Sequence, residues 1–547
     1  MSRQNMTLEQ KIGQMIMCGF QTAQINTEIK TLIEEHHLGG IIYFRRNVND
    51  KEQVGQLSID LQQYSKQFTD IPLFISVDQE GGMVARLDWD DITLIPGNMA
   101  VGASRDVELA YEMARICGEE LLRMGINMNF APSVDINNNP KNPVIGVRSY
   151  GECPELVSEM GAAQIRGLQE ANVSASAKHF PGHGDTAVDS HHGLAAVPHD
   201  EERLFAMELA PFVRAIQEGV DCIMTAHVMF PAFEPEQIPS TISRKVLTDL
   251  LRNRLGFEGV IVTDCLEMHA ISKEFGIPEG TIRAVEAGAD LILISHRFTE
   301  QVNAIHALVD AVRSGRISEQ RIDESVDRIL ALKAKRQMEK LTAITENYAE
   351  GFGSESSKKA VQLLCERSIT LVKDEGQLPL RKDERTLVIW PEVRQRTEVD
   401  EPIIQAYTLA TALQPSMSQV DEYRIGTYPD AAEVQAAVAH AKDYDQVIVI
   451  TYNAVSELHE GQVNIVKQLT QHSNVRVIVA STRNPYDFNQ FPEAKTYLCC
   501  YENRPATMTA LAKVLLGESP TVGRLPVSIN ETYGFGFGQQ LDSTVQV

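Results

Sequence analysis

Apolar positions along the first 343 residues fall into short runs that are separated by longer amphipathic segments. Eight runs predict strands, and they comprise residues 13–20, 39–44, 73–78, 127–135, 174–180, 221–227, 259–264 and 290–295. Between them, apolar residues recur at steps of three and four, as at 108–125, 201–219 and 299–315, and predict helices. Strands and helices in alternation are typical of a parallel sheet, and eight such units in about 300 residues predict a (β/α)8 TIM-type barrel in the α/β class.

A polar stretch with glycine and serine, ITENYAEGFGSESSKK at 344–359, interrupts this pattern and predicts a linker. Beyond it, strand-like runs alternate with helical patterns; the runs lie at 385–392, 444–454, 474–485 and 495–505, and the helical patterns at 431–443 and 507–518. These runs are too few for a second barrel, so we expect a smaller α/β sandwich. The predicted organisation is a barrel domain at 1–343, the linker at 344–359 and a sandwich domain at 360–547.

Composition adds mainly exclusions to this picture. The chain is 43% hydrophobic and 23% charged, as in globular proteins, and its formal net charge is −24. Nucleic acids and anionic membranes are held by clustered lysine and arginine, which this acidic chain lacks. The eight cysteines form no C-x-x-C pair, and no stretch resembles a secretory signal or a membrane span. We therefore expect a cytoplasmic protein, monomeric or weakly dimeric, without nucleic-acid or membrane partners.

Ionisable residues stand at the ends of four predicted barrel strands. Asp78, His227 and Asp264 end their strands, and Lys178 with His179 lies near the end of a fourth. In a TIM-type barrel the carboxyl ends of the strands carry the catalytic groups. Each residue can instead cap its strand or bond a neighbouring amide, since terminal aspartate is common in turns. Four such ends around one mouth favour a shared site.

The stretch KHFPGHGDTAVDSHHG, at 178–193, contains four histidines and two aspartates in a long loop. Imidazole and carboxylate together suit zinc or iron, so a metal site is one interpretation. Pro181 and Gly182 argue against it, because they prevent His179 and His183 from sharing a helix face. We therefore predict no metal and no other cofactor.

A second interpretation gives the histidines separate roles. His183 lies among turn residues and is better explained as a structural hydrogen-bonding residue. Asp189 lies two residues before His191, so its carboxylate can hold one ring nitrogen and favour the imidazolium that a general acid requires. A solvated loop histidine beside a turn-forming aspartate explains the same local sequence, and both interpretations stay open on these residues alone.

Several motifs together resemble the β-N-acetylglucosaminidase branch of glycoside hydrolase family 3, in its two-domain form typical of Gram-positive bacteria. The motifs are VDQEGGMVARL (77–87), NPVIGVRSYG (142–151), KHFPGHGDTAVDSH (178–191), GVIVTDCLEM (259–268), RIDESVDRIL (321–330), SITLVKDEGQLPL (368–380) and GRLPVSI (523–529). The resemblance therefore extends over nearly the whole chain.

The resemblance implies a role for each matching residue. Asp264 is the expected nucleophile, and His191 assisted by Asp189 is the expected general acid/base. The expected sugar-binding residues are Asp78, Arg86, Arg148, Lys178 and His179, to which the strand-end argument adds His227. Met83 departs from the family pattern, which often has arginine there, with little expected consequence because Arg86 is present.

The implied reaction is removal of terminal GlcNAc, with retention, from GlcNAc-MurNAc cell-wall fragments during peptidoglycan recycling. A neutral histidine base adds no negative charge beside an incoming nucleophile, so phosphorolysis by phosphate is one alternative. A β-glucosidase of the same family is disfavoured by the Asp-x-His loop, and a sugar-binding protein without turnover by the complete catalytic set. Two interpretations of the motif YENRP at 501–505 stay open: it forms a rim of the active site, or it is only the end of a sheet strand.

Overall fold

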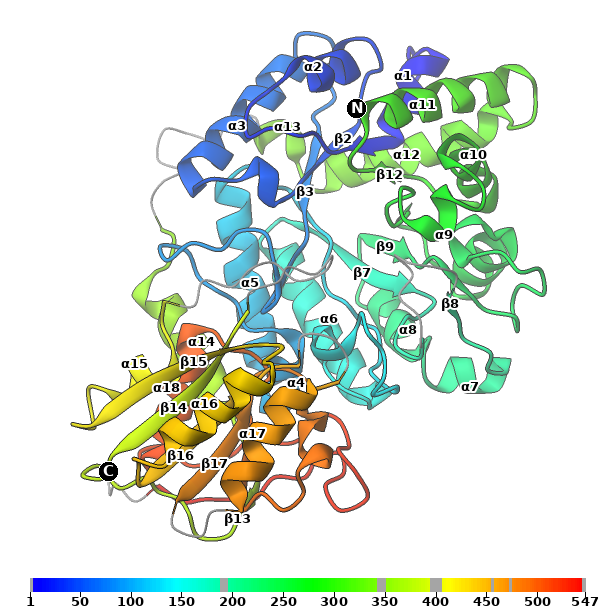
Figure 1. Ribbon diagram of the computed structural model, residues 1–547. Helices are drawn as coiled ribbons and strands as arrows, with labels where there is room; N and C mark the ends of the chain where they lie inside the picture. The colour runs from blue at the N-terminus through cyan, green and yellow to red at the C-terminus, as the bar shows by residue number, and fades with distance from the viewer. Residues whose placement is uncertain are drawn as a thin grey trace.

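The structure of the chain is a computed structural model that describes residues 3–186, 195–341, 351–393, 406–453, 457–471 and 475–543. Two parallel-rich sheets dominate it, and the second lies beside the first, against the barrel flank that contains α4 and α5 (Figure 1).

Eight parallel strands form the first sheet, in the order β11-β9-β7-β6-β3-β2-β1-β12. Their bounds are β1 (Ile16–Cys18), β2 (Gly40–Tyr43), β3 (Phe74–Val77), β6 (Met128–Asn129), β7 (Ser174–Phe180), β9 (Cys222–Thr225), β11 (Val260–Val262) and β12 (Ile292–Ile294). A parallel bridge between Val262 and Leu291, with a bond of 3.0 Å from Thr263 N to Leu291 O, joins β11 to the chain entering β12. The sheet thus closes into the predicted barrel, and all eight predicted strands are confirmed.

Helices surround the barrel. They are α1 (Leu8–Gln14), α2 (Thr27–Glu34), α3 (Lys51–Ser65), α4 (Asn98–Ser104), α5 (Val107–Arg123), α6 (Pro154–Glu170), α7 (Glu201–Ala206), α8 (Ala210–Gln217), a π-helix (Lys245–Arg254), α9 (His269–Ser272), α10 (Ile277–Ala287), α11 (Phe298–Arg313), α12 (Glu319–Lys335) and α13 (Met338–Leu341). Local sequence fixes their starts, as where the Asp106 side chain accepts from Leu109 N and caps α5. The helices predicted at 108–125 and 299–315 are confirmed.

The single helix predicted at 201–219 is wrong, because the chain breaks between α7 and α8. Met207 leaves helical geometry (φ −124°, ψ −86°), and Pro211 stands in the first turn of α8. Proline has no N–H for the carbonyl four residues earlier, here that of Met207, and its ring clashes with that carbonyl in a continuous helix. Proline is tolerated in a first turn, so a new helix starts there.

Lys333 on α12 is fully buried at the amino ends of the barrel strands, where β1 and β2 begin. Its Nζ donates to Gln14 Oε1 (2.8 Å) and to the carbonyl of Gly39 (2.9 Å), and it lies 4.7 Å from the Phe74 ring centre. Burial lowers the pKa of Lys333 to about 7. This end of the barrel thus encloses a lysine whose partners are neutral oxygens and a ring.

The second sheet has the order β13-β18-β17-β16-β14-β15, with β13 antiparallel to β18. Its strands are β13 (Thr370–Asp374), β14 (Thr386–Glu392), β15 (Val420–Gly426), β16 (Gln446–Thr451), β17 (Arg476–Ser481) and β18 (Thr496–Cys499). Its helices are α14 (Glu355–Ser368), α15 (Leu409–Leu413), α16 (Ala431–Ala441), α17 (Glu460–Thr470) and α18 (Pro505–Leu515). The four predicted strands and both predicted helices are confirmed within a smaller α/β domain.

The two strands missed by the sequence analysis, β13 and β15, lie at the two edges of this sheet. Most side chains of β15 are at least partly exposed, so VDEYRIG lacks the apolar run of a strand buried on both faces. The proposed linker and domain limits stay predictions; α14 begins at Glu355, inside the predicted linker, and packs on α4 and α5 of the barrel as well as on α18.

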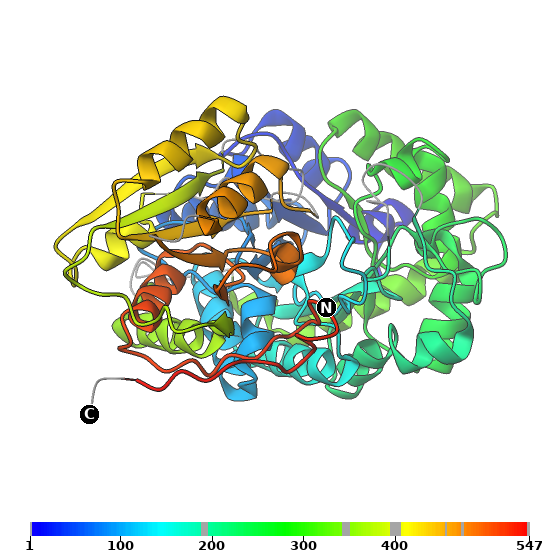
Figure 2. The ribbon, with the colours of Figure 1, turned by 60° about the horizontal axis from the view of Figure 1, so that its bottom comes forward.

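The segment after α18 returns to the barrel (Figure 2). There Ser528 donates through N (2.9 Å) and Oγ (2.6 Å) to the Glu152 carboxylate. The same segment covers β13, because Gln539 N donates to Leu371 O (2.7 Å) and Gln539 Oε1 accepts from Asp374 N (2.9 Å). Within the described residues, no helix has both the length and the apolar character that crossing a membrane requires.

Candidate active site

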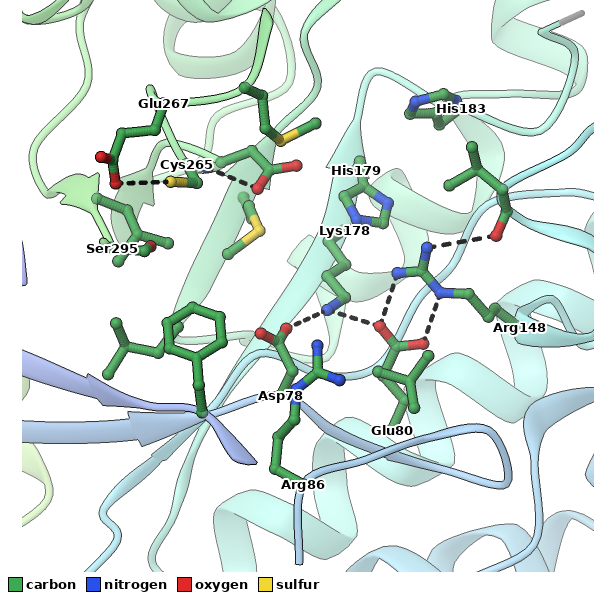
Figure 3. A pocket seen from close by; sticks show the side chains of 18 of the residues that line it. Asp78, Glu80, Arg86, Arg148, Lys178, His179, His183, Cys265, Glu267 and Ser295 are labelled. Carbon is green, nitrogen blue, oxygen red and sulfur yellow. Dashed lines mark hydrogen bonds and ion pairs between the residues drawn. The ribbon is translucent and has the colours of Figure 1, made fainter. Parts of the chain in front are cut away.

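A cavity of about 460 Å³ lies at the carboxyl ends of the barrel strands (Figure 3). Five predicted sugar-binding residues and the predicted nucleophile line it: Asp78, Arg86, Arg148, Lys178, His179 and Asp264. Apolar side chains from β2, β9 and β12, namely Ile42, Met224 and Leu293, complete its floor. The structure therefore brings together residues that are up to 186 positions apart, at the barrel face where catalytic groups are expected.

Lys178 is the centre of a charged network in this cavity. Its side chain is almost completely buried, and its Nζ lies 2.7 Å from Asp78 Oδ1 and 2.7 Å from Glu80 Oε1. Arg148 from the short turn Gly146–Arg148 binds Glu80 through two bonds, Nη2–Oε1 (2.7 Å) and Nε–Oε2 (3.0 Å). Figure 3 shows these four side chains converging on one side of the cavity.

The network keeps its members charged. Burial raises the pKa of Glu80, but Arg148 and Lys178 outweigh burial and hold this pKa well below its usual range. Burial lowers the pKa of Lys178, but Asp78 and Glu80 outweigh it and raise the pKa above its usual value. Because an ammonium has only donors and a carboxylate only acceptors, the cavity offers both kinds of partner to a polyhydroxylated ligand.

Arg86 is held by a short hairpin of β4 (Gln79–Gly81) and β5 (Val84–Ala85). The Gln79 side chain spans the hairpin, accepting at Oε1 from Arg86 N (2.9 Å) and Leu87 N (3.1 Å). Gln79 N in turn donates to Asn129 Oδ1 on β6 (3.0 Å). The hairpin thus presents Glu80 and Arg86 to the cavity from a fixed backbone.

Asp135 orients the histidines that follow β7. Its Oδ2 lies 2.7 Å from His179 Nδ1, and its Oδ1 accepts from His183 N (2.7 Å). Burial raises the pKa of Asp135, but the interaction with His179 outweighs burial and lowers the pKa to about 2. The carboxylate is therefore ionised and fixes the proton of His179 on Nδ1.

His183 also lines the cavity, but its surroundings suit a structural residue. Its Nδ1 lies 2.9 Å from Thr186 Oγ1, and burial lowers its pKa to about 4, so the ring is neutral near pH 7. A neutral, buried and bonded imidazole agrees with the interpretation that His183 supports the loop.

Asp264 follows β11 and stands in the cavity wall. Its Oδ1 accepts from Cys265 N (2.7 Å), and its side chain is part-buried. Figure 3 places the neighbouring Cys265 and Glu267 on one side of the cavity and Arg148 on the other. A ligand in the cavity therefore lies beside the Asp264 carboxylate and within reach of the charged network.

The predicted acid/base pair, His191 and Asp189, lies outside the described residues. Description stops at Thr186 and resumes at Ala195, where the short strand β8 (Ala195–Ala196) pairs with β10 (Val228–Met229). Across this part of the chain, His199 Nε2 lies 2.7 Å from Asp185 Oδ2. Both assignments stay predictions.

His227 lies behind the strand end that carries Asp264, and its role as a substrate contact stays a prediction. It is buried and is not among the residues that line the cavity. Its Nε2 lies 2.9 Å from the carbonyl of Cys265 and its Nδ1 lies 2.7 Å from Thr241 Oγ1. A polar strand-end residue can turn toward the next strand as well as toward the mouth, and this ring supports the strand end that carries Asp264.

Two carboxylates of the site, Glu80 and Asp135, escaped the sequence analysis. Asp135 ends a predicted strand, so the strand-end rule that selected Asp78 and Asp264 also applies to it. Glu80 lies in the hairpin after β3, and only its place in the VDQEGG motif marked it.

Two groups of side chains in the described part of the chain have the geometry to hold a metal ion: Cys265, Glu267 and His296, and Asp185, His199 and Glu208. The sequence analysis had identified neither group as a metal site. Both groups are already bonded within the protein. Glu267 accepts from His296 N (2.5 Å) and Arg297 N (3.1 Å), and Glu208 pairs with Arg203 (2.9 Å). Burial raises the pKa of the Cys265 thiol to about 12, so metal binding there must displace a proton. The absence of a metal stays a prediction.

Comparison with known proteins gives matches over both domains. The model of the glycosyl hydrolase family 3 N-terminal domain matches residues 7–332, and that of the family's C-terminal domain matches residues 369–543. Beta-hexosaminidase A of Pseudoalteromonas piscicida is 32% identical over 96% of this chain and 97% of its own length. The beta-N-acetylglucosaminidase/beta-glucosidase of Cellulomonas fimi is 28% identical over 84% of each chain. The solved structure of a family 3 beta-N-acetylglucosaminidase from Paenibacillus sp. FPU-7 is 51% identical and superposes with a TM-score of 0.93, covering 96% of this chain and 99% of that one.

Proposed function

We propose a specific reaction for this chain, which belongs to glycosyl hydrolase family 3 and is a glycoside hydrolase. The reaction is removal of a terminal, non-reducing β-linked N-acetylglucosamine residue with retention of configuration. Two full-length relatives support this substrate, since their names state hexosaminidase or N-acetylglucosaminidase activity and one is 51% identical.

The observation that carries the proposal is that one cavity holds both a strand-end carboxylate and a charged sugar-binding network. Asp78 is the more exposed carboxylate beside Lys178, so it is available to accept from sugar hydroxyls. Arg86 and Lys178 line the same cavity as cationic donors. Asp264 lines the same cavity and is suited to attack the anomeric carbon of a sugar residue bound there.

In the proposed mechanism, Asp264 forms a covalent glycosyl-enzyme and His191 moves the protons. Attack of the Asp264 carboxylate on C1 breaks the glycosidic bond, while protonated His191 gives its proton to the departing oxygen. The neutral imidazole then takes a proton from water, which attacks C1 and releases Asp264. Asp189 is proposed to favour the imidazolium and hold its orientation.

We extend the proposal to the physiological substrate, terminal GlcNAc on GlcNAc-MurNAc cell-wall fragments, and to cytoplasmic peptidoglycan recycling. The sequence resemblance supports the substrate, and the cysteines support a reducing compartment. All eight cysteines are free thiols, and six of them are buried.

Labelling of the nucleophile tests the reaction. A 5-fluoro derivative of an activated N-acetylglucosaminide forms the glycosyl-enzyme and then hydrolyses slowly, so the intermediate accumulates. Peptide mapping by mass spectrometry is expected to find the sugar on Asp264, and Asp264→Ala is expected to stay unlabelled and inactive. Labelling of another carboxylate, such as Glu267, would overturn the assignment, and NMR that finds inversion at C1 would overturn the mechanism.

A broader activity is the second candidate. The Cellulomonas fimi relative carries both N-acetylglucosaminidase and β-glucosidase in its name, so β-glucosidase activity is the observation-based alternative. Aryl N-acetylglucosaminide and aryl glucoside should be compared by kcat/KM, with and without inorganic phosphate. We expect the N-acetylated substrate to be strongly preferred. Formation of N-acetylglucosamine 1-phosphate in place of free sugar would establish the phosphorylase alternative.

A further inference from the structure

The segment Tyr501–Pro505 of the second domain reaches the barrel through Arg504. Arg504 is buried, with 4% of its surface exposed. Its Nε (3.0 Å) and Nη2 (2.5 Å) both donate to the carbonyl of Gly82, and its Nη1 donates to Asp88 Oδ1 (2.7 Å). The partners are more than 400 positions away in sequence, so the second domain bonds a short stretch of the barrel at two points.

Gly82 is constrained on every side at this contact. Its φ of +56° belongs to the left-handed region, its N donates to Ile95 O (2.8 Å), and a Cβ added to it would lie 2.7 Å from the Cα of Gly97. Gly97 is itself held by the second domain, because its N donates to Glu502 Oε2 (2.9 Å). Arg504 and Glu502 therefore hold the turn of the β4–β5 hairpin and the neighbouring Gly97 from the side of the second domain.

Arg86 lies in sequence between Gly82 and Asp88, the two residues that Arg504 binds. Gly82 lies in the turn of the hairpin, and Asp88 lies two residues beyond Arg86; Glu80 lies two residues before Gly82. From the barrel side, the Gln79 side chain holds the same stretch at Arg86 N and Leu87 N. The Arg86 backbone is thus fixed from both domains, whereas its side chain faces the cavity.

We propose that Arg504 is a positioning residue for sugar binding: the second domain fixes the hairpin that carries Glu80 and Arg86, whereas none of its described residues lines the cavity. The proposal rests on the proposed function for its substrate. It assigns YENRP a role other than a rim or a free sheet end. It also implies that the barrel requires the second domain for full affinity toward its sugar.

Buried charge makes this contact sensitive to substitution. Asp88 and Arg504 are both buried, so removal of the guanidinium leaves the Asp88 carboxylate without its cation. The stretch from Gly82 to Asp88 must then rearrange or Asp88 must take up a proton. Lysine is a poor replacement, because one ammonium does not reproduce the planar donors that serve a carbonyl and a carboxylate together.

Kinetics of Arg504→Met and Arg504→Lys test the proposal. Because Arg504 is expected to act on binding, we expect Arg504→Met to raise KM for an aryl N-acetylglucosaminide, and Ki for free N-acetylglucosamine, by about 10-fold or more, with kcat changed much less. The KM and Ki of Arg504→Lys should lie between those of wild type and Arg504→Met. The matched control is Arg105→Met, since Arg105 Nη2 also crosses between the domains, to Leu525 O (2.9 Å), but does so at the C-terminal end of α4 and not at the hairpin. Equal effects of Arg504→Met and Arg105→Met, or an effect on kcat alone, would overturn the proposal.

Hydrogen exchange gives a readout that does not depend on the substrate. The hairpin peptide spanning residues 79–88 is expected to exchange faster in Arg504→Met than in wild type and Arg105→Met, because local opening becomes easier. Unchanged exchange would overturn the positioning role even if the enzyme acts on another sugar. If Arg504→Met does not fold, the double variant Asp88→Asn/Arg504→Gln removes both charges, and the same KM and exchange changes are expected of it.

Discussion

Two buried lysines, Lys178 and Lys333, stand at opposite ends of the same barrel and meet opposite environments. Lys178 at the carboxyl ends contacts two carboxylates, Asp78 and Glu80, at 2.7 Å each. Lys333 at the amino ends contacts an amide oxygen, a carbonyl and the face of Phe74. The pKa of Lys178 is raised, whereas burial lowers the pKa of Lys333 to about 7.

The difference shows that burial alone does not determine the charge of a side chain. Desolvation disfavours both ammonium groups, and only the anions at the mouth reverse the outcome. The mouth therefore concentrates permanent charges that a polar ligand can use, and the opposite end holds a lysine that adds to stability mainly when neutral. The predictions below test this contrast between a chemical end and a structural end.

The largest expected effect is at the proposed acid/base of the mouth. His191→Ala should slow hydrolysis of substrates with a sugar leaving group by about 10²- to 10⁴-fold, the usual contribution of a general acid. A dinitrophenyl glycoside should still form the glycosyl-enzyme at a comparable rate, because its oxygen departs as a stabilised anion. Steady-state and pre-steady-state kinetics with both substrates measure this.

Azide provides the control for His191. It needs no deprotonation, so it should restore turnover of the dinitrophenyl substrate and yield a β-glycosyl azide. Asp189→Asn should give a weaker version of the same pattern. An equal loss with both substrates, without azide rescue, would make His191 a binding or structural residue.

The next effect compares the two lysines directly. Lys178→Met removes two charge-assisted hydrogen bonds and leaves Asp78 unpaired by its lysine, so we expect kcat/KM to fall by roughly 10²- to 10³-fold. Lys333→Met, a change of the same shape at the other end, should leave kcat/KM within about twofold at neutral pH. Similar losses in both variants would contradict the division between the two ends.

Stability should depend on pH through Lys333 more than through Lys178. The folded-state pKa of Lys333, about 7, lies below its usual 10.5, so unfolding takes up a proton between these values. The contribution of Lys333 to the free energy of unfolding therefore rises with pH in this window, by at most about 1.4 kcal/mol per pH unit, and is least below pH 7. Unfolding midpoints of wild type and Lys333→Met between pH 7 and 9.5 measure the difference. A constant difference across this range would show that Lys333 stays charged in the fold.

The smallest expected effect is that of a chelator. If the charges at the cavity come only from side chains and no metal ion takes part, prolonged dialysis against EDTA should leave kcat/KM unchanged. Loss of activity that zinc restores would contradict this, and Cys265→Ser together with His199→Ala would then identify which group of side chains binds the metal.

The sequence predicted the barrel well because its strands are buried throughout and most are predominantly apolar, which makes them recognisable runs. The edge strands β13 and β15 escaped because partly exposed strands mix polar and apolar residues. The helix at 201–219 was wrong because periodicity outweighed Pro211 in the prediction. In both cases single residues that depart from the hydrophobic pattern, the polar residues of the edge strands and Pro211, determine the local structure.

The site was predictable where chemistry lies at strand ends and less so beyond them. Asp78, Lys178 and Asp264 follow from that rule, and the structure places them around one cavity. His227 obeys the rule but turns toward Cys265 and Thr241, and no sequence pattern specifies that direction. The bond from Arg504 to Gly82 joins two domains through a backbone carbonyl, which leaves no trace in residue type.

The C-terminal segment that covers β13 has a consequence for how the protein behaves at high concentration. An uncovered edge strand offers unpaired N–H and C=O groups to other chains and promotes aggregation. Here Gln539 binds Leu371 and Asp374, while on the other edge β15 carries charged side chains, including Asp421, Glu422 and Arg424. One edge of the sheet is thus covered by the segment around Gln539, and the other is protected by charge. We therefore expect a chain that ends before residue 519 to expose β13 as a template for intermolecular pairing and to aggregate more readily at high concentration.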